Sequence, residues 1–266
     1  MKAALWAATL GLALAAGAPA SSARADCLDH QALLSEDAGA LDQLPSAPWT
    51  VNRQYIQFVP VGKVPGDKAI RVTYEGSDIG SPRVGANVRL RKPAREASLT
   101  YTVTFERGFQ FVRGGKLPGL GPEQPVTGGR EVTASGWSVR PVFRADGTLG
   151  LYIYHQDMKG RYGSGGTLVT RYPISLGTEH KVELQVTLNS TPASFDGSAR
   201  LFVDGRLVEE AKGLRYFTSV EPPLVSRLLF QTFFGGSGPS YAPRVGTQYA
   251  TVHAQFDHLK VCDATN

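Results

Sequence analysis

The chain has 266 residues, of which 42% are hydrophobic and 19% are charged, and its formal net charge is +5. This length is enough for one large domain or two small ones, and the mildly basic balance suits an acidic partner without identifying it. No apolar stretch beyond the N-terminal segment is long enough to span a bilayer, so a membrane-spanning helix elsewhere is excluded.

The first 25 residues are typical of a secretory signal peptide. Lys2 gives a short positive start, residues 3–18 form an apolar run rich in Ala and Leu, and Ala23-Arg24-Ala25 is an A-x-A cleavage site. We therefore expect a secreted or periplasmic protein. Cleavage removes two basic residues and no acid, so the net charge falls from +5 to 5 − 2 = +3.

The mature chain, 26–266, is expected to be a single domain with two cysteines, Cys27 and Cys262. Asp26 stands where a lipobox requires a small residue, which argues against lipid attachment at Cys27. An even cysteine count in an exported protein favours a disulfide between the two over free thiols. The absence of a CxxC pair or a His/Cys cluster predicts no zinc site. We expect no cofactor, and a structural calcium ion is not readable from the sequence.

Short alternating runs separated by turn residues follow, which is typical of an antiparallel two-sheet β-sandwich. Residues 28–43 are the only segment that resembles a helix. The segment HKVELQVTL (180–188) alternates between polar and apolar residues, as a half-buried strand does. The predicted strands are 54–59, 69–74, 87–91, 99–106, 136–144, 150–155, 167–172, 180–188, 199–203, 206–209, 226–233 and 251–261.

The segment GGKLPGL, residues 114–120, comes after the strand predicted at 99–106. Three glycines and a proline predict a turn here. Lys116 stands inside this constrained frame, although a solvated surface lysine would not need one. Lys116 is therefore a candidate functional residue.

The next two strands, GWSVRPVF and LYIYH, form a predicted hairpin whose register decides which side chains meet. A two-residue turn would place Arg140 opposite an apolar residue and turn one apolar face outward. A three-residue loop that ends in a left-handed Gly147 instead places Arg140 opposite Tyr152 and Ser138 opposite Tyr154. We predict this second register, because a one-residue slip would invert the burial of both strands.

Ser138, Arg140, Tyr152 and Tyr154 would then share one exposed sheet face. Taken singly, each has an ordinary structural explanation, such as a half-buried cross-strand tyrosine pair or a solvated arginine. The joint arrangement with Lys116 is harder to explain in this way.

These residue types favour one kind of chemistry. The chain shows neither a nucleophile–His–acid signature nor the paired carboxylates of a glycoside hydrolase. Arginine, lysine and two phenols suit β-elimination in a uronate chain. A cation beside the C6 carboxylate stabilises the enolate-like charge, one group removes the C5 proton, and another protonates the departing O4.

Five segments resemble polysaccharide lyase family 14 in sequence and in order. They are RVTYEGS (71–77), GFQFVRGGKLPGL (108–120), GWSVR (136–140), DGTLGLYIY (146–154) and FQTFFGG (230–236). The resemblance covers roughly residues 50–262. It implies a β-jelly roll and a lyase that cleaves alginate or a related polyuronate.

The resemblance also implies which residues are functional. The motif lysine matches Lys116, the Ser-x-Arg pair matches Ser138 and Arg140, and the Tyr-x-Tyr pair matches Tyr152 and Tyr154. Two features depart from the family pattern. The segment GPEQPVTGGR stands where a shorter Gly-rich loop is expected, and Phe143 stands where a tryptophan is common.

Roles follow from this set. Arg140 and Lys116 would bind the uronate carboxylate, and Lys116 would alternatively serve as the base if its pKa is depressed. Tyr152 and Tyr154 would be base and acid in an order that the sequence leaves open, and Ser138 would orient one of them or the sugar.

Candidate substrate-binding residues outside this set are Arg89, Arg91, Gln231 and His155. The segment VRLRKPAR (88–95) adds a basic stripe, although a solvated edge strand guarded by positive charge explains it more simply. His155 and His253 could lie at the rim, but neither sits in a matching motif, so neither is expected to be the principal base.

Two other classes of function stay open. One is a non-catalytic jelly-roll module that binds an acidic polysaccharide, and the other is a lectin-like structural protein, which buried tyrosines would favour. The expected partner is an acidic polysaccharide, with no nucleic acid and no membrane, and the protein is expected to be a monomer. Which uronate is cleaved is not decided by the sequence.

Overall fold

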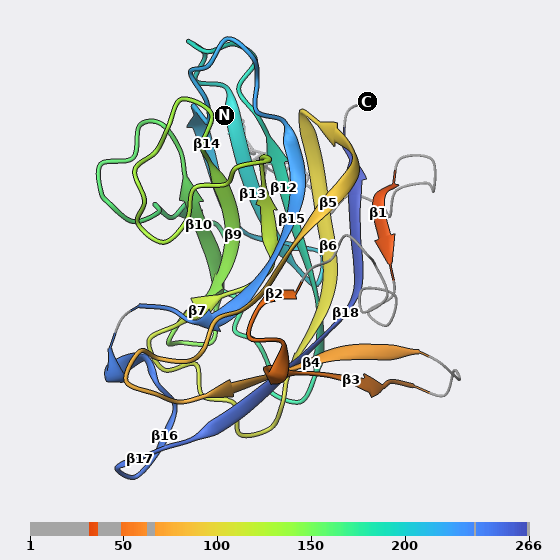
Figure 1. Ribbon diagram of the computed structural model, residues 1–266, viewed down its shortest axis with the longest axis vertical. Helices are drawn as coiled ribbons and strands as arrows, with labels where there is room; N and C mark the ends of the chain where they lie inside the picture. The colour runs from red at the N-terminus through yellow and green to blue at the C-terminus, as the bar shows by residue number, and fades with distance from the viewer. Residues whose placement is uncertain (1–31, 37–48, 63–66, 237, 265–266) are drawn as a thin grey trace, which may run out of the picture.

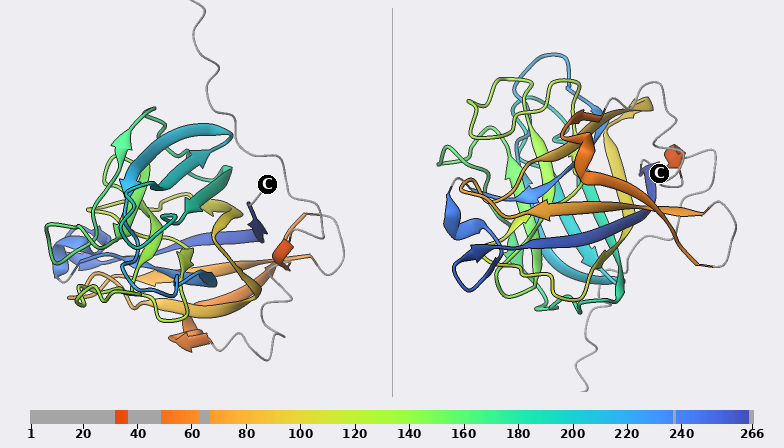
Figure 2. Two further views of the ribbon diagram at one scale, coloured as in Figure 1. Left: turned by 90° about the horizontal axis from the view of Figure 1, so that it is seen from above. Right: turned by 60° about the horizontal axis from the view of Figure 1, so that its bottom comes forward.

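The computed structural model describes residues 32–36, 49–62, 67–236 and 238–264. Two antiparallel sheets pack face to face as a β-sandwich of the jelly-roll type, which confirms the predicted fold class (Figure 1). Figure 2 shows the same two layers from two further directions. The predicted signal peptide, residues 1–25, lies outside the described residues.

The larger sheet has the strand order β11-β14-β13-β12-β6-β18-β4-β3, and β1 also pairs with β18. Its strands are β1 (Ala32–Glu36), β3 (Ile56–Pro60), β4 (Lys68–Glu75), β6 (Glu96–Phe105), β11 (Thr167–Leu168), β12 (Glu179–Thr187), β13 (Gly197–Val203), β14 (Arg206–Leu214) and β18 (Thr251–Asp263).

The smaller sheet has the order β10-β9-β7-β15-β5-β2, and β8 pairs with both β15 and β9. Its strands are β2 (Trp49–Val51), β5 (Val84–Ala94), β7 (Gly115–Lys116), β8 (Gly119–Gly121), β9 (Ser138–Phe143), β10 (Leu149–Tyr154) and β15 (Val225–Phe234). A two-stranded ribbon, β16 (Arg244–Val245) and β17 (Gln248–Tyr249), and two 3₁₀ turns, η3 (Arg53–Tyr55) and η4 (Pro239–Tyr241), complete the described elements.

Alternate side chains of the two sheets meet in one buried cluster. In β12, Val182, Leu184 and Val186 are buried, as the alternating pattern predicts. On β15, Leu228 and Phe230 point into the same cluster. The opposite face of β15 carries Arg227, Leu229, Gln231 and Phe233, because successive side chains of a strand alternate between faces. We call this side of the smaller sheet the site face.

In the larger sheet, two predictions of secondary structure are wrong. Within the helix predicted at 28–43, residues 32–36 form β1, which pairs antiparallel with the end of β18. Pairing with an existing strand edge supplies backbone hydrogen bonds and outweighs a weak helical propensity. The strand predicted at 167–172 is reduced to Thr167–Leu168, which pairs only with Glu209 and Glu210 of β14.

Candidate active site

The hairpin of β9 and β10 has the predicted register. Tyr152 lies opposite Arg140, and Tyr154 lies opposite Ser138. Gly147 has a φ of 75°, so the turn has the left-handed residue that this register requires. The sequence therefore places these four residues correctly on one face of the sheet.

The residues of the opposite face are buried, which also confirms the prediction. Val139, Leu151 and Ile153 each keep at most 1% of their surface exposed. Trp137, just before β9, is fully buried and donates from Nε1 to the carbonyl oxygen of Pro223 at 2.8 Å. This packing fixes the hairpin against the core, and with it the side chains on the site face.

The prediction that the four site residues form an exposed patch is wrong. Ser138 and Tyr154 are fully buried, Arg140 is 2% exposed, and only Tyr152 is half-buried. The segment 122–135, which contains most of the departure from the family pattern, covers Ser138 and Tyr154. Ser138 Oγ donates to the carbonyl oxygen of Val126 at 2.6 Å, and the Gly129 amide donates to the Tyr154 hydroxyl at 2.7 Å.

The buried position of Tyr154 differs from that of a core residue. Its ring is absent from the buried cluster between the sheets, and its hydroxyl accepts a hydrogen bond from a surface segment. The ring contacts Tyr152 edge-on, with centroids 5.7 Å apart. Tyr154 therefore lies on the site face beneath a cover, and its burial does not support the lectin-like alternative.

Lys116 lies on a strand, whereas the sequence predicted a turn for GGKLPGL. Its strand β7 pairs with Phe233 and Phe234 of β15 on one side and with β9 on the other. The glycines permit this insertion because their neighbours leave no room for side chains. A Cβ on Gly115 would lie 2.2 Å from Cζ of Phe143, and a Cβ on Gly119 would lie 2.2 Å from the carbonyl oxygen of Val139.

Lys116, Arg140 and Tyr152 line a cavity of about 650 Å³, whereas the buried Ser138 and Tyr154 do not. Its described lining contains five basic side chains and no Asp or Glu. The basic residues are Arg83, Arg113, Lys116, Arg140 and Arg144, and the aromatic lining residues are Phe143, Tyr152, Tyr162, Phe233 and Tyr241. A cavity of this composition attracts an anionic ligand and offers flat apolar surfaces for sugar rings.

Arg140 has no carboxylate partner among the described residues. Its Nη1 donates to Oε1 of Gln231 at 3.2 Å, while its Nε has no hydrogen-bond partner in the part of the chain that the structure describes. Burial lowers the pKa of Arg140 to about 10, so the side chain is still a cation at neutral pH. A buried cation without a counter-ion is costly, and an anion entering the cavity would relieve that cost.

Lys116 and Tyr152 have pKa values shifted in opposite directions. Burial, with the positive charge of Arg140 as the second cause, lowers the pKa of Lys116 to about 7. Burial, together with the neighbouring Tyr154, raises the pKa of Tyr152 to about 12. The lysine Nζ lies 3.1 Å from the centroid of the Tyr152 ring. A proton acceptor and a proton donor are thus adjacent at neutral pH.

Of the predicted substrate-binding residues, only Gln231 lies beside the candidate catalytic residues. Gln231 lies at the site, where it contacts Arg140 and donates to Asn87 Oδ1 at 3.2 Å. His155 does not line the 650 Å³ cavity. It shares a hydrogen bond with Ser164, and burial lowers its pKa. His253 lies on β18 in the other sheet.

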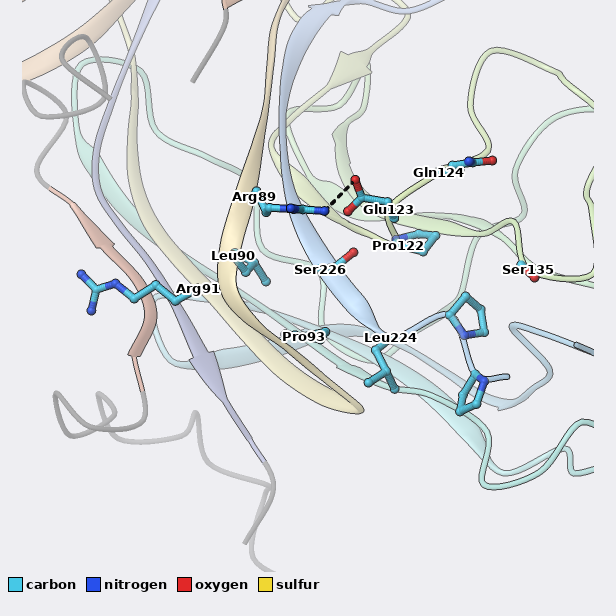
Figure 3. Close-up of a pocket in the computed structure, with 12 residues that line it drawn as sticks. Arg89, Leu90, Arg91, Pro93, Pro122, Glu123, Gln124, Ser135, Leu224 and Ser226 are labelled. Atoms are coloured by element: carbon cyan, nitrogen blue, oxygen red, sulfur yellow. Dashed lines mark ion pairs between the residues drawn. The ribbon is translucent and has the colours of Figure 1, made fainter. Parts of the chain in front are cut away.

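Arg89 and Arg91 line a second cavity, of about 670 Å³ (Figure 3). Arg89 forms an ion pair with Glu123, with Nη2 and Oε1 3.2 Å apart. Arg91 points away from Glu123 in the same view. Both arginines therefore lie at this second cavity and not at the cavity of Lys116.

Sequence reasoning missed several lining residues, notably Arg83, Arg113 and Tyr162. The Arg83 guanidinium stacks on Phe233 at 4.8 Å, and that of Arg113 on Tyr241 at 5.2 Å. Tyr162 is 59% exposed at the rim. All three lie outside the strand motifs. Of the three, only Arg113 could have been found from the sequence, because it belongs to the segment GFQFVRGGKLPGL and stands close to Lys116.

Three further predictions concern the cysteines, metals and membranes. Cys262 is buried near the end of β18, but its predicted partner Cys27 lies outside the described residues, so the disulfide stays a prediction. In the described part of the chain, no group of three or more His, Cys, Asp or Glu residues could hold a metal ion. No helix among the described residues is long and apolar enough to cross a membrane.

Comparison with known protein families gives one match that covers most of the chain. The family model described as Polysaccharide lyase 14 matches residues 66–256. A search of curated proteins found no match.

Solved structures give matches in fold. Alginate lyase Aly36B matches with 23% sequence identity and a TM-score of 0.70, over 87% of this chain and 96% of that chain. Alginate lyase vAL-1 from a Chlorella virus matches with 20% identity and a TM-score of 0.66, over 87% and 99%. The endo-β-1,4-glucuronan lyase of the fungus Trichoderma reesei matches with 16% identity and a TM-score of 0.58, over 88% and 96%. At these identities the matches show a shared fold.

Proposed function

This chain belongs to the polysaccharide lyase 14 family, and from that membership we propose that it depolymerises alginate, or a closely related polyuronate, by β-elimination. Three observations support the proposal: the family match, the cationic cavity, and the structural matches that act on alginate or glucuronan by their names. A variant of Aly36B was solved in complex with an alginate tetrasaccharide, which supports alginate as the first substrate to test.

The observation that carries the proposal is the buried Arg140, which has no carboxylate partner among the described residues. Its guanidinium lines the cavity, and Nε lacks a partner among the described residues. A planar guanidinium matches the geometry of a carboxylate. When the C5 proton leaves, negative charge spreads onto the C6 carboxylate, and a fixed, buried cation stabilises that charge more strongly than solvent does.

Proton transfer is assigned to Lys116 and Tyr152. In β-elimination the C5–H and C4–O4 bonds break, a C4–C5 double bond forms, and the departing O4 receives a proton. A lysine with a pKa of about 7 is partly neutral at neutral pH, and its amine can accept the C5 proton. A tyrosine with a pKa of about 12 keeps its proton and can donate it to O4. Tyr154 and Ser138 position the Tyr152 ring and the covering segment.

A substrate panel tests the proposal. Purified protein would be incubated with polymannuronate, polyguluronate and glucuronan, and the ultraviolet absorbance of the unsaturated product would be followed. We expect absorbance to rise with at least one polymer. In a Tyr152→Phe variant, kcat should fall on the order of a hundredfold, because the proton donor is removed while little volume changes.

The outcomes separate the enzyme from the binding module. If no polymer gives an unsaturated product but alginate still binds, the protein is a non-catalytic module that binds an acidic polysaccharide and not a lyase. If Tyr152→Phe keeps full activity on a substrate that the wild type cleaves, the assignment of the proton donor is wrong.

Export is a further part of the proposal. The N-terminal 25 residues have the charge, apolar run and cleavage site of a signal peptide. Expression of the full chain in a bacterial host should give a periplasmic protein that begins at Asp26. Mass spectrometry of the intact protein would detect this, and retention of Met1 in the cytoplasm would contradict it.

A further inference from the structure

Arg89 of β5 and Arg227 of β15 form a cross-strand pair of like charges. The two residues are direct partners in the register of these strands. Both point to the site face, because their neighbours Val88 and Leu228 point into the core. Like charges directly opposite each other destabilise a sheet, so this pair requires a compensating group.

The compensating group is Glu123, which comes from the segment that covers the active site. Its Oε1 contacts Nη2 of Arg89 at 3.2 Å and also accepts a hydrogen bond from Nη2 of Arg227. Figure 3 shows the Arg89 side chain extending from β5 toward this carboxylate. The two arginines thus hold one carboxylate between them.

The ion pairs of Glu123 with Arg89 and Arg227 are accessible from solvent, so a ligand can compete for the two arginines. The side chains of Arg89 and Glu123 are 65% and 49% exposed, and that of Arg227 is 21% exposed. An exposed ion pair contributes at most about 1 kcal/mol, so a ligand carboxylate can displace Glu123 at modest cost. The adjoining cavity of about 670 Å³ supplies room for a sugar ring.

We propose that Arg89 and Arg227 form a second uronate-carboxylate subsite, which Glu123 occupies until the polysaccharide displaces it. The proposal rests on the proposed function, since it assumes a polyuronate substrate that binds along the site face.

The position of the pair fits one extended substrate. Arg227 and Gln231 are both on the site face of β15, and Gln231 contacts Arg140. Four residues of a strand span about 13 Å, which is more than a single sugar ring can reach. The segment 122–135 connects the two cavities. Pro122 and Glu123 line the cavity of Arg89, and Thr127 and Gly128 line the cavity of Lys116. A long chain that releases Glu123 would bind at both.

The test compares substrate lengths in a Glu123→Gln variant. Oligomannuronates of two to ten units would be tested for KM, and for Kd by calorimetry at low temperature. Removing the competing charge should lower the KM ratio of long to short oligomers by about fivefold, the size expected for one exposed charge pair. Glu131→Gln, an exposed glutamate of the same segment, is the matched control and should leave the ratio unchanged.

Two further variants locate the effect. Arg89→Gln and Arg227→Gln in the Glu123→Gln background should abolish the gain. Carboxyl-reduced oligomers, which lack the charge, should show no gain with Glu123→Gln. Thermal melting of each variant would verify that the fold is retained.

The results distinguish failure of this subsite from failure of the proposed function. If the wild type cleaves polyuronates but Glu123→Gln leaves the length dependence unchanged or weakens long-chain binding, the subsite does not exist. A gain that persists without Arg89 and Arg227 would also overturn it. If the wild type neither binds nor cleaves any polyuronate, the proposed function itself fails.

Discussion

A single buried arginine links stability and activity at the residue scale. Arg140 keeps its charge although burial lowers its pKa to about 10, and it has no carboxylate partner among the described residues. Desolvation of such a cation destabilises the folded protein. This loss of stability is explained if the charge acts in the transition state, because a preorganised charge stabilises a transition state most strongly where it is shielded from water.

We therefore expect Arg140→Met to lose activity but not stability. Methionine fills a similar volume without a charge, so the free energy of unfolding should stay within about 1 kcal/mol of the wild type or rise. The value of kcat/KM should fall on the order of a hundredfold or more. Urea unfolding and steady-state kinetics on the same preparation would measure both. A loss of several kcal/mol in stability would show that Arg140 is mainly structural.

The pH dependence of activity should follow Lys116. Its pKa is lowered from the ordinary lysine value to about 7, so the amine loses its proton as the pH rises through about 7. The neutral amine is the proposed base, so log kcat/KM should rise below this pH and level off above it. Lys116→Arg keeps a cation at all accessible pH values and should be inactive throughout. A profile that falls as the pH increases from about 6 to about 8 would contradict this assignment.

At this scale the sequence predicted which way the side chains of the hairpin point, but not how exposed they are. The face shared by Arg140 and Tyr152 followed from the turn at Gly147, because strand periodicity converts a register into a direction. The burial of Tyr154 could not follow, because the Gly129 amide that covers it comes from a segment without periodicity. Arg83 and Arg113 reach the cavity through tertiary packing on aromatic rings, which no local pattern encodes.

At the scale of elements, the short strand β7 explains why the lysine stands among glycines. It inserts between β9 and β15 and so places Lys116 in the lining of the cavity. The glycines allow the backbone to approach its neighbours, and this close approach replaces the side-chain packing that a longer strand would use.

Gly115→Ala should disturb this insertion. The new Cβ would lie 2.2 Å from Cζ of Phe143 and 2.4 Å from the carbonyl oxygen of Phe233, and a backbone oxygen cannot easily move away. We expect a loss of about 1–3 kcal/mol in unfolding free energy and a lower kcat, as Lys116 shifts. Gly160→Ala is the control, since its nearest contact is an ordinary 3.8 Å. Equal stability of the two variants in urea unfolding would show that β7 can relax.

Long strands were predictable, and short ones were not. The strand at 180–188 was predicted because alternation over many residues is a strong pattern, and β12 covers Glu179–Thr187. β7 and β8 have two and three residues, too few for any period, and exist because β9 and β15 provide partners on both sides. The helix predicted at 28–43 was wrong for the same reason: a tertiary partner, β18, determines the structure of residues 32–36.

At the scale of the whole molecule, the N-terminal strand and the last strand close the chain on itself. β1 pairs with β18, and Ala32 lies directly opposite Cys262. Cys27 precedes Ala32 by only five residues in the sequence. The register of β1 thus brings the N-terminal segment to the strand that carries Cys262, and it supports a disulfide that would close nearly the whole mature chain into one loop.

Removal of this predicted bridge should destabilise the protein without changing its chemistry. Closing a loop of this size restricts the unfolded chain, and the expected contribution is roughly 3–5 kcal/mol, less any strain in the folded state. A Cys27→Ser/Cys262→Ser variant should therefore melt at a lower temperature, and a reducing agent should lower the melting temperature of the wild type but not of the variant. Because Cys262 lies near the end of β18 in the larger sheet and does not line the cavity of Lys116, kcat at low temperature should be retained. Thiol titration of the unfolded, unreduced wild type decides the matter, since two reactive thiols per chain would mean that no bridge forms.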